Sequence, residues 1–244
     1  MVDFLLSIVT VTKNCVGTIG GTLDSVAALK GPGVEYVVVD GVSSDGTLEL
    51  ILQRGLLVDQ LLSEPDSGIY NAMNKGVALA RGRYVLFING DDQLLMDGFP
   101  TVLETLATGR EAIVCATTLV GRPERPTETL MAVPRHLPFF NSVPHPSSFV
   151  LRNLLLRQPF REDLRIVSDY DFFLRAYLAG HKFRVLPVVT ALHQRGGASG
   201  NVIRSQVELE QVRRERLGWR YPLFNALANL YRHGKRLLQA PLHG

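Results

Sequence analysis

The first 110 residues alternate short apolar runs with helix-like segments, and this alternation constrains the fold more than any other feature of the sequence. Residues 4–12 and 34–40 are β-branched apolar runs typical of buried strands, and each ends at a polar cluster. Helix-like segments follow each run. The same order continues with strands at 59–64 and 84–88 and helices at 18–29, 47–54, 69–80 and 96–108. This alternation predicts an α/β fold with a doubly wound, mainly parallel sheet.

The second half of the chain differs from the first in composition and in its pattern of predicted elements. Residues 122–138 are rich in proline and arginine, which predicts a hairpin and a loop. We expect a helix that opens at 167–171 and ends near residue 179, followed by a strand-like segment at 182–192. Two further helices are predicted at 203–217 and 222–238.

Charge is distributed unevenly along the 244 residues. The net charge is +3, but residues 204–244 carry 8 basic and 3 acidic side chains, so the first 203 residues sum to −2. A nucleic-acid-binding protein is expected to be basic over its whole body, so we expect no nucleic acid partner. The basic tail is expected to meet phosphate-bearing lipid or solvent. A hydrophobic content of 46% is typical of a folded globular protein and excludes a disordered chain.

Cysteine usage and the apolar opening bear on the cellular compartment. Cys15 and Cys115 lack the spacing of a zinc site and the density of a disulfide scaffold, so we expect both to be free and buried. Residues 4–11 are apolar, but the run is too short to span a bilayer and no basic region precedes it. We therefore expect neither secretion nor a transmembrane anchor, which predicts a cytoplasmic protein.

Polar clusters follow three of the predicted strands, at residues 12–14, 40–45 and 89–92. The carboxyl ends of parallel strands meet at one edge of the sheet, where ligands bind in folds of this kind. Asp40 at such an end suits a nucleobase N–H or a ribose hydroxyl, and the alternative is a turn with a helix cap. The pair Asp91 and Asp92 suits Mg²⁺ or Mn²⁺, and the alternative is a solvated turn.

Residues 63–76 form a predicted loop that runs into a helix, with Lys75 one to two turns inside it. A helix N-terminus with a nearby cation attracts phosphate, and the alternative is a capped surface helix.

Taken together, four motifs in this order resemble the family 2 glycosyltransferases of the GT-A fold. The motifs are residues 9–14, 38–47, 63–76 and 86–92. The resemblance covers about residues 4–200 and is closest to enzymes of bacterial exopolysaccharide and lipopolysaccharide assembly, such as those of colanic acid. It implies a Rossmann-like, mainly parallel sheet flanked by helices, with further helices at the C-terminal end.

The resemblance also implies a nucleotide-diphosphate sugar donor. The residues that it places around this donor are Thr12, Asn14, Asp40, Ser43, Asp66, Lys75, Asn89 and Asp91. It implies Mn²⁺ or Mg²⁺ at Asp92, with Asp91 beside it, although the Asp-Asp pair departs from the family's D-x-D. His193 is a candidate third ligand where close relatives can carry an aromatic residue, and the turn at 196–197 borders the donor.

Asp169 matches the family's general base, and a single base opposite the leaving group implies inversion at the anomeric carbon. The alternative for Asp169 is a helix cap. Asp171 lies two residues further along the helix, points away from Asp169 and is expected to be structural. His145 is placed in the acceptor pocket, and the alternative is a structural histidine.

The predicted organisation is a glycosyltransferase domain over 1–203 and a basic amphipathic helical tail over 204–244. Within the domain, 1–110 is the nucleotide-sugar half and 111–203 the acceptor half. The acceptor is a glycan, which the resemblance makes lipid-linked at the inner face of the plasma membrane. The tail is predicted either to lie on that membrane or to pack on the core with a solvated basic face.

Two other functions compete with this interpretation. A nucleotidyltransferase would need a Lys- and Arg-rich triphosphate loop near the N-terminus, where Lys13 stands alone. A non-catalytic nucleotide-sugar sensor, or a scaffold subunit of a polysaccharide assembly complex, would keep Asp40 but tolerate loss of Asp92 and Asp169, and both are present.

Overall fold

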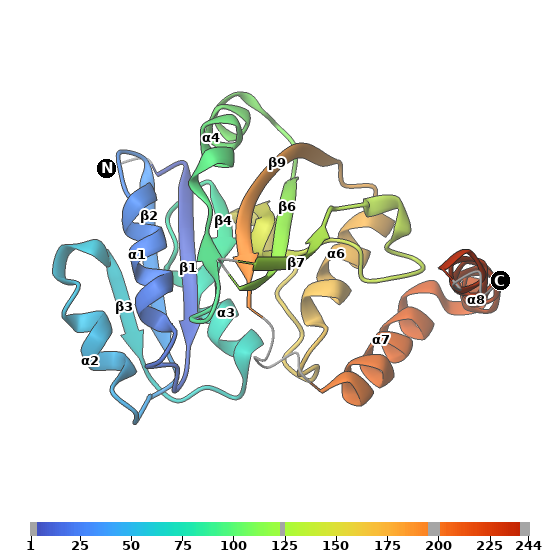
Figure 1. Cartoon of the computed structure of the whole chain (residues 1–244), viewed down its shortest axis with the longest axis horizontal. Coiled ribbons are helices and arrows are strands. Elements are labelled where there is room, and N and C mark those ends of the chain that lie inside the picture. Colours follow the sequence, from blue (N-terminus) through green and yellow to red (C-terminus); the bar gives the residue numbers. More distant parts are fainter. Residues whose placement is uncertain (1–3, 123–124, 195–200, 240–244) are drawn as a thin grey trace.

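A computed structural model describes residues 4–122, 125–194 and 201–239 (Figure 1). Its first half contains β1 (Leu6–Thr12), α1 (Ile19–Leu29), β2 (Val34–Asp40), α2 (Thr47–Leu52), β3 (Gln60–Ser63), α3 (Ile69–Leu79) and β4 (Tyr84–Phe87). The next elements are β5 (Gln93–Leu94), α4 (Phe99–Thr108), β6 (Ile113–Arg122), β7 (Arg125–Leu130) and the short 3₁₀ turn η4 (His145–Ser147). The last are β8 (Ser148–Leu151), α5 (Arg152–Arg157), α6 (Ser168–Leu178), β9 (Phe183–His193), α7 (Val202–Leu217) and α8 (Tyr221–Gln239). These bounds confirm the predicted alternation and the hairpin.

One sheet of nine strands organises the described residues, in the order β3-β2-β1-β4-β8-β6-β9-β5, with β7 paired to β6. From β3 to β4 every pair is parallel, and Thr12 at the end of β1 lies opposite Asp40 at the end of β2. From β8 onward the pairing changes, because β8 runs antiparallel to both β4 and β6 whereas β9 is parallel to β6. The prediction of a mainly parallel sheet therefore holds for the first half only, and the whole sheet is mixed.

Helices cover both faces of the sheet, as the alternation of side chains along β1 requires. Leu6 and Ile8 pack with α1 and α4 on one face, whereas Val9 and Val11 pack with α3 and α6 on the other. Gly76 lets α3 approach β1 closely, because a Cβ there would lie 2.4 Å from Val9 Cγ1. The polar ends of the central strands are thus fixed by packing on two sides.

The predicted tail begins as part of the folded body. Val212 and Leu217 of α7 are buried, and the carboxylate of Glu208 accepts hydrogen bonds from the backbone N–H groups of Arg165 and Ile166. Helix α8 follows at the end of the molecule remote from β1 to β3 (Figure 1). Side chains after residue 230 and the whole of 240–244 lie outside the described residues, as does the predicted turn at 196–197.

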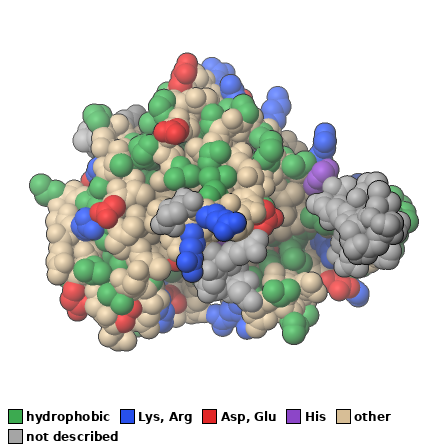
Figure 2. Space-filling view, viewed as in Figure 1, with side chains coloured by type: hydrophobic (Ala, Val, Ile, Leu, Met, Phe, Trp, Pro, Cys, Tyr) green, Lys and Arg blue, Asp and Glu red, His purple; other side chains and the backbone are tan. Residues whose placement is uncertain are grey.

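Exposed side chains of both charges are spread over the face shown in Figure 2. In the parts of the chain that the structure describes, none of the helices is both long enough and apolar enough to cross a membrane.

Candidate active site

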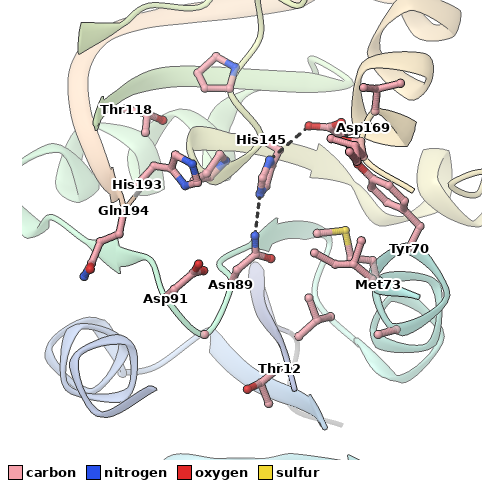
Figure 3. A pocket seen from close by; sticks show the side chains of 18 of the residues that line it. Thr12, Tyr70, Met73, Asn89, Asp91, Thr118, His145, Asp169, His193 and Gln194 are labelled. Atoms are coloured by element: carbon pink, nitrogen blue, oxygen red, sulfur yellow. Dashed lines mark hydrogen bonds and ion pairs between the residues drawn. The ribbon is translucent and has the colours of Figure 1, made fainter. Parts of the chain in front are cut away.

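A cavity of 1260 Å³ runs from the carboxyl ends of β1 and β4 to the start of α6 (Figure 3). The predicted site residues that line it are Thr12, Asn14, Asp66, Asn89, Asp91, His145, Asp169 and His193. The predicted site residues outside its described lining are Asp40, Ser43, Lys75 and Asp92. The structure therefore joins residues from both halves of the chain in one cavity.

Asp40 organises the loop beside the cavity. Its carboxylate is fully buried and accepts hydrogen bonds from the Ser43 N–H at 3.1 Å, the Ser43 hydroxyl at 2.5 Å and the Ser63 hydroxyl at 2.7 Å. Asn14 joins this loop to β1, because its N–H donates to Ser43 Oγ at 2.9 Å and its Oδ1 accepts from the Ser44 N–H at 2.9 Å. Asn14 holds a left-handed backbone with φ of 52°. Asp40 itself does not line the cavity, but it fixes Ser43, which in turn holds Asn14 at the cavity.

The loop before α3 places its two predicted residues differently. Asp66 lines the cavity and accepts a hydrogen bond from the Gly68 N–H at 2.9 Å. Lys75 instead donates to the backbone carbonyl of Pro65 and pairs with Glu64, both at 2.8 Å. Its ammonium group supports the loop from outside the cavity.

Asp91 and Asp92 face different surroundings although they are adjacent. Asp92 is fully buried, with Oδ1 2.7 Å from His193 Nδ1 and accepting from the Gln194 N–H at 3.2 Å. Its Oδ2 is buried without a hydrogen-bond partner among the described residues. Asp91 lines the cavity, and burial, followed by the charge of Asp92, raises the pKa of its carboxyl.

These residues fit a divalent cation that a substrate helps to hold. Within the described part of the chain, no three His, Cys, Asp or Glu side chains form a complete metal site. Mg²⁺ and Mn²⁺ are commonly bound by one or two carboxylates together with substrate phosphate oxygens. A cation held by Asp91 and Asp92 would offset the repulsion between the two carboxylates, and the buried Oδ2 of Asp92 has no other partner among the described residues.

Asp169 lies at the opposite wall, in the first turn of α6. Its Oδ2 is 3.3 Å from His145 Nδ1, and its Oδ1 accepts a hydrogen bond from the Tyr70 hydroxyl at 3.1 Å (Figure 3). Burial and the Asp169 charge raise the pKa of Tyr70 well above its usual range, so Tyr70 remains a donor. The sequence marks Tyr70 only by its place in the 63–76 motif, because its partner Asp169 lies 99 residues away.

Asp171, which is predicted to be structural, is not among the residues that line the cavity. It is fully buried and pairs with Arg175 Nε at 2.8 Å and Arg216 Nε at 2.7 Å. This cluster joins α6 to α7.

Cys15 corrects one prediction. Both cysteines are free and Cys115 is buried, but Cys15 is only half-buried and lines the cavity, with Sγ 2.5 Å from Thr12 Oγ1. Burial raises the pKa of the Cys15 thiol, which keeps it protonated at neutral pH. A Cβ at Gly90 would lie 2.6 Å from this sulfur, so glycine is needed there for close approach of the two loops.

Comparison with known proteins identifies the family. The sequence profile described as glycosyl transferase family 2 matches residues 7–164, well over half of the chain. The chain is a family 2 glycosyltransferase. This confirms the predicted family and the predicted class of enzyme.

The relatives of this glycosyltransferase agree with the assignment. A Mycobacterium bovis protein named PGL/p-HBAD biosynthesis glycosyltransferase is 27% identical over 217 residues, covering 85% of this chain and 84% of its own. Among solved structures, Staphylococcus aureus TarS with UDP gives a TM-score of 0.70 at 20% identity, over 88% of this chain and 66% of that one. The mannosyltransferase PcManGT of Pyrobaculum calidifontis, with GDP-Man and Mn²⁺, gives 0.67 at 22% identity, over 86% and 63%. The structural likeness confirms the GT-A fold.

Proposed function

We propose that this enzyme moves a sugar from a nucleotide-diphosphate sugar to an acceptor hydroxyl with inversion at the anomeric carbon. The observation that carries the proposal is the position of Asp169, which faces the same cavity as the strand-end loops from the opposite wall (Figure 3). In this assignment residues 1–110 hold the donor and 111–203 the acceptor. A base on one side and a leaving group on the other favour a single in-line displacement.

Each wall has a separate chemical task. The Asp169 carboxylate accepts the proton of the acceptor hydroxyl as that oxygen attacks, while Thr12, Asn14 and Asp66 bind the nucleoside. Asp91 and Asp92 would hold Mn²⁺ or Mg²⁺, which would supply Lewis-acid stabilisation of the negative charge that develops on the diphosphate. The nucleotide and Mn²⁺ complexes of TarS and PcManGT support this donor class and metal.

We also propose that the acceptor is a lipid-linked glycan and that α8 lies on an anionic membrane, at the inner face of the plasma membrane. Trp219, Leu223, Leu227 and Leu230 lie on one side of α8 and its preceding turn and are 45–90% exposed. Residues 218–244 contain basic but no acidic side chains. An exposed apolar stripe with positive charge complements anionic headgroups above an apolar layer.

Binding and turnover test the donor proposal. Calorimetric titration with UDP, GDP, dTDP and CMP, with and without Mn²⁺, is expected to select one nucleotide whose affinity depends on the metal. With the matching nucleotide sugar, Asp169→Asn should lower turnover about 10²- to 10⁴-fold while nucleotide affinity is kept. The control Asp163→Asn, at an exposed carboxylate, should change neither. Nucleotide binding without any turnover would favour the sensor function instead.

Vesicle sedimentation tests the membrane proposal. Binding to vesicles of phosphatidylcholine with phosphatidylglycerol, but not phosphatidylcholine alone, should be lost in Leu223→Glu with Leu227→Glu. The control Leu56→Glu changes a fully exposed leucine in the first half of the chain and should leave binding intact. A concentration-dependent dimer that the same double substitution abolishes would instead make the stripe a subunit interface.

A further inference from the structure

The His145 imidazole has both of its nitrogens engaged by side chains from the two opposite walls. Nδ1 lies 3.3 Å from Asp169 Oδ2, and Nε2 lies 3.4 Å from Asn89 Nδ2 (Figure 3). His145 belongs to η4, Asn89 follows β4 and Asp169 begins α6, so three separate elements meet at this ring. The side chains of His145 and Asp169 are only 22% and 12% exposed.

With the Asn89 amide oriented as here, the chemistry of the partners favours one direction for each contact, the hydrogen bond with Asn89 and the ion-pair contact with Asp169. An ionised carboxylate only accepts, so Asp169 requires a proton on His145 Nδ1. The Asn89 amide nitrogen only donates, so it requires a lone pair on His145 Nε2. A neutral imidazole with its proton on Nδ1 satisfies both partners, and the ring then has no free polar atom to offer an acceptor sugar.

Asp169 is contacted on both carboxylate oxygens and keeps lone pairs for a further donor. His145 serves Oδ2 and Tyr70 serves Oδ1, and Tyr70 is itself anchored because its hydroxyl also donates to the Ile166 carbonyl at 2.6 Å. A carboxylate offers about four lone-pair directions, so the hydrogen bond from Tyr70 and the contact with His145 leave capacity for an acceptor hydroxyl. The two donors set the rotation of the carboxylate plane.

We propose that His145 is a positioning residue, held by Asn89, that orients the Asp169 carboxylate toward the reacting hydroxyl. This positioning role replaces the acceptor-binding role that the sequence predicts for His145. Asn89 stands two residues before Asp91. The contacts of His145 with Asn89 and Asp169 therefore connect the orientation of the proposed base to the loop that carries the proposed metal ligands. The proposal rests on the proposed role of Asp169 as general base.

The tautomer of His145 tests the geometry without substrate. Long-range ¹H–¹⁵N spectra distinguish the two neutral tautomers, and the signal of His145 among the six histidines is the one missing in His145→Gln. We expect the Nδ1–H form in the wild type and a change of its signals in Asp169→Asn. An Nε2–H form, or a signal that Asp169→Asn leaves unchanged, would overturn the proposal whatever the enzyme's substrates.

Hydrolysis of the donor by water separates positioning from acceptor binding, because no acceptor is present. UDP-glucose, UDP-N-acetylglucosamine, GDP-mannose and dTDP-rhamnose serve as probes. His145→Ala should slow hydrolysis about 10- to 100-fold with nucleotide affinity kept within about twofold, as expected for a misplaced catalytic group. His145→Gln, whose amide can still donate to Asp169, should restore part of the rate, and the control His181→Ala should match the wild type.

The possible failures are distinguishable. Unchanged hydrolysis in His145→Ala with a large loss in Asp169→Asn would reject positioning and restore an acceptor-binding role. Unchanged hydrolysis in Asp169→Asn would instead reject the base assignment within the proposed function.

Discussion

Two walls of the cavity, named after their proposed roles, are held by different kinds of contact. The donor wall is formed by the loops after β1 and β4, and the acceptor wall by the start of α6 and the residues before it. On the donor wall, β1 and β2 are paired in parallel along their whole length, so the backbone ladder itself brings Thr12 opposite Asp40. On the acceptor wall, α6 is tied to α7 by the buried carboxylate of Asp171 and its arginines. A ladder distributes its stability over many bonds, whereas a buried ion-pair cluster concentrates it in a few groups. Single substitutions should therefore lower the stability of the acceptor wall more than that of the donor wall.

On the donor wall, the largest effect is expected at the proposed metal ligands Asp91 and Asp92. Asp92→Asn should lower sugar transfer about 10³-fold and remove the Mn²⁺ dependence of nucleotide affinity, because a neutral amide cannot offset the cation. Calorimetry and turnover measure the two effects. Asp97→Asn, an exposed acid five residues on, is the control. If nucleotide affinity still depended on Mn²⁺ in Asp92→Asn, the metal would have to be held by other residues.

The next largest effect is on the stability of the acceptor wall. Asp171→Asn should lower the free energy of unfolding by about 3–5 kcal/mol, because Arg175 and Arg216 lose their buried counter-charge. Urea denaturation measures this loss. The nucleotide affinity of the folded protein should stay unchanged, since β1 and β2 do not depend on the cluster. A parallel loss of nucleotide affinity would show that the two walls are coupled.

Asp91→Asn should stabilise the metal-free protein by about 1 kcal/mol at neutral pH. Burial raises the folded-state pKa of Asp91 above its ordinary 3.8, so the folded protein binds this proton more tightly than the unfolded chain. Stability is therefore lost as pH rises from that value through the raised pKa, and the loss persists above it. Thermal unfolding from acid to neutral pH should show a smaller loss in Asp91→Asn. An equal loss of stability with rising pH in the wild type and in Asp91→Asn would show that Asp91 does not cause it.

The smallest effect is expected at Lys75. Lys75→Ala removes a partly exposed ion pair with Glu64 and should cost about 1 kcal/mol or less, with nucleotide affinity within about twofold of the wild type. Calorimetry and urea denaturation measure both. A tenfold loss of nucleotide affinity would mean that Lys75 leaves Glu64 to bind the donor, as the sequence motif suggested.

Sequence patterns served the first half of the chain better than the second. The predicted strands at 34–40 and 84–88 agree with β2 and β4 to within one residue, because a strand that is buried on both faces is a short, continuous apolar run in the sequence. The antiparallel insertion of β8 was not predicted, because a strand's partner depends on how the chain returns after a long excursion. His145 and Tyr70 were missed as neighbours of Asp169 for the same reason.

The sequence by itself determined the alternation of strands and helices, the family, and the polar clusters at the strand ends, because each of these depends on residues that are close together in the sequence. Only the tertiary structure decided which side chains face the cavity. Asp91 lines it while Asp92 is buried, and Asp169 meets Tyr70 across 99 positions of sequence. Side-chain direction and partner choice follow from packing between distant elements, and packing has no local signature in the chain.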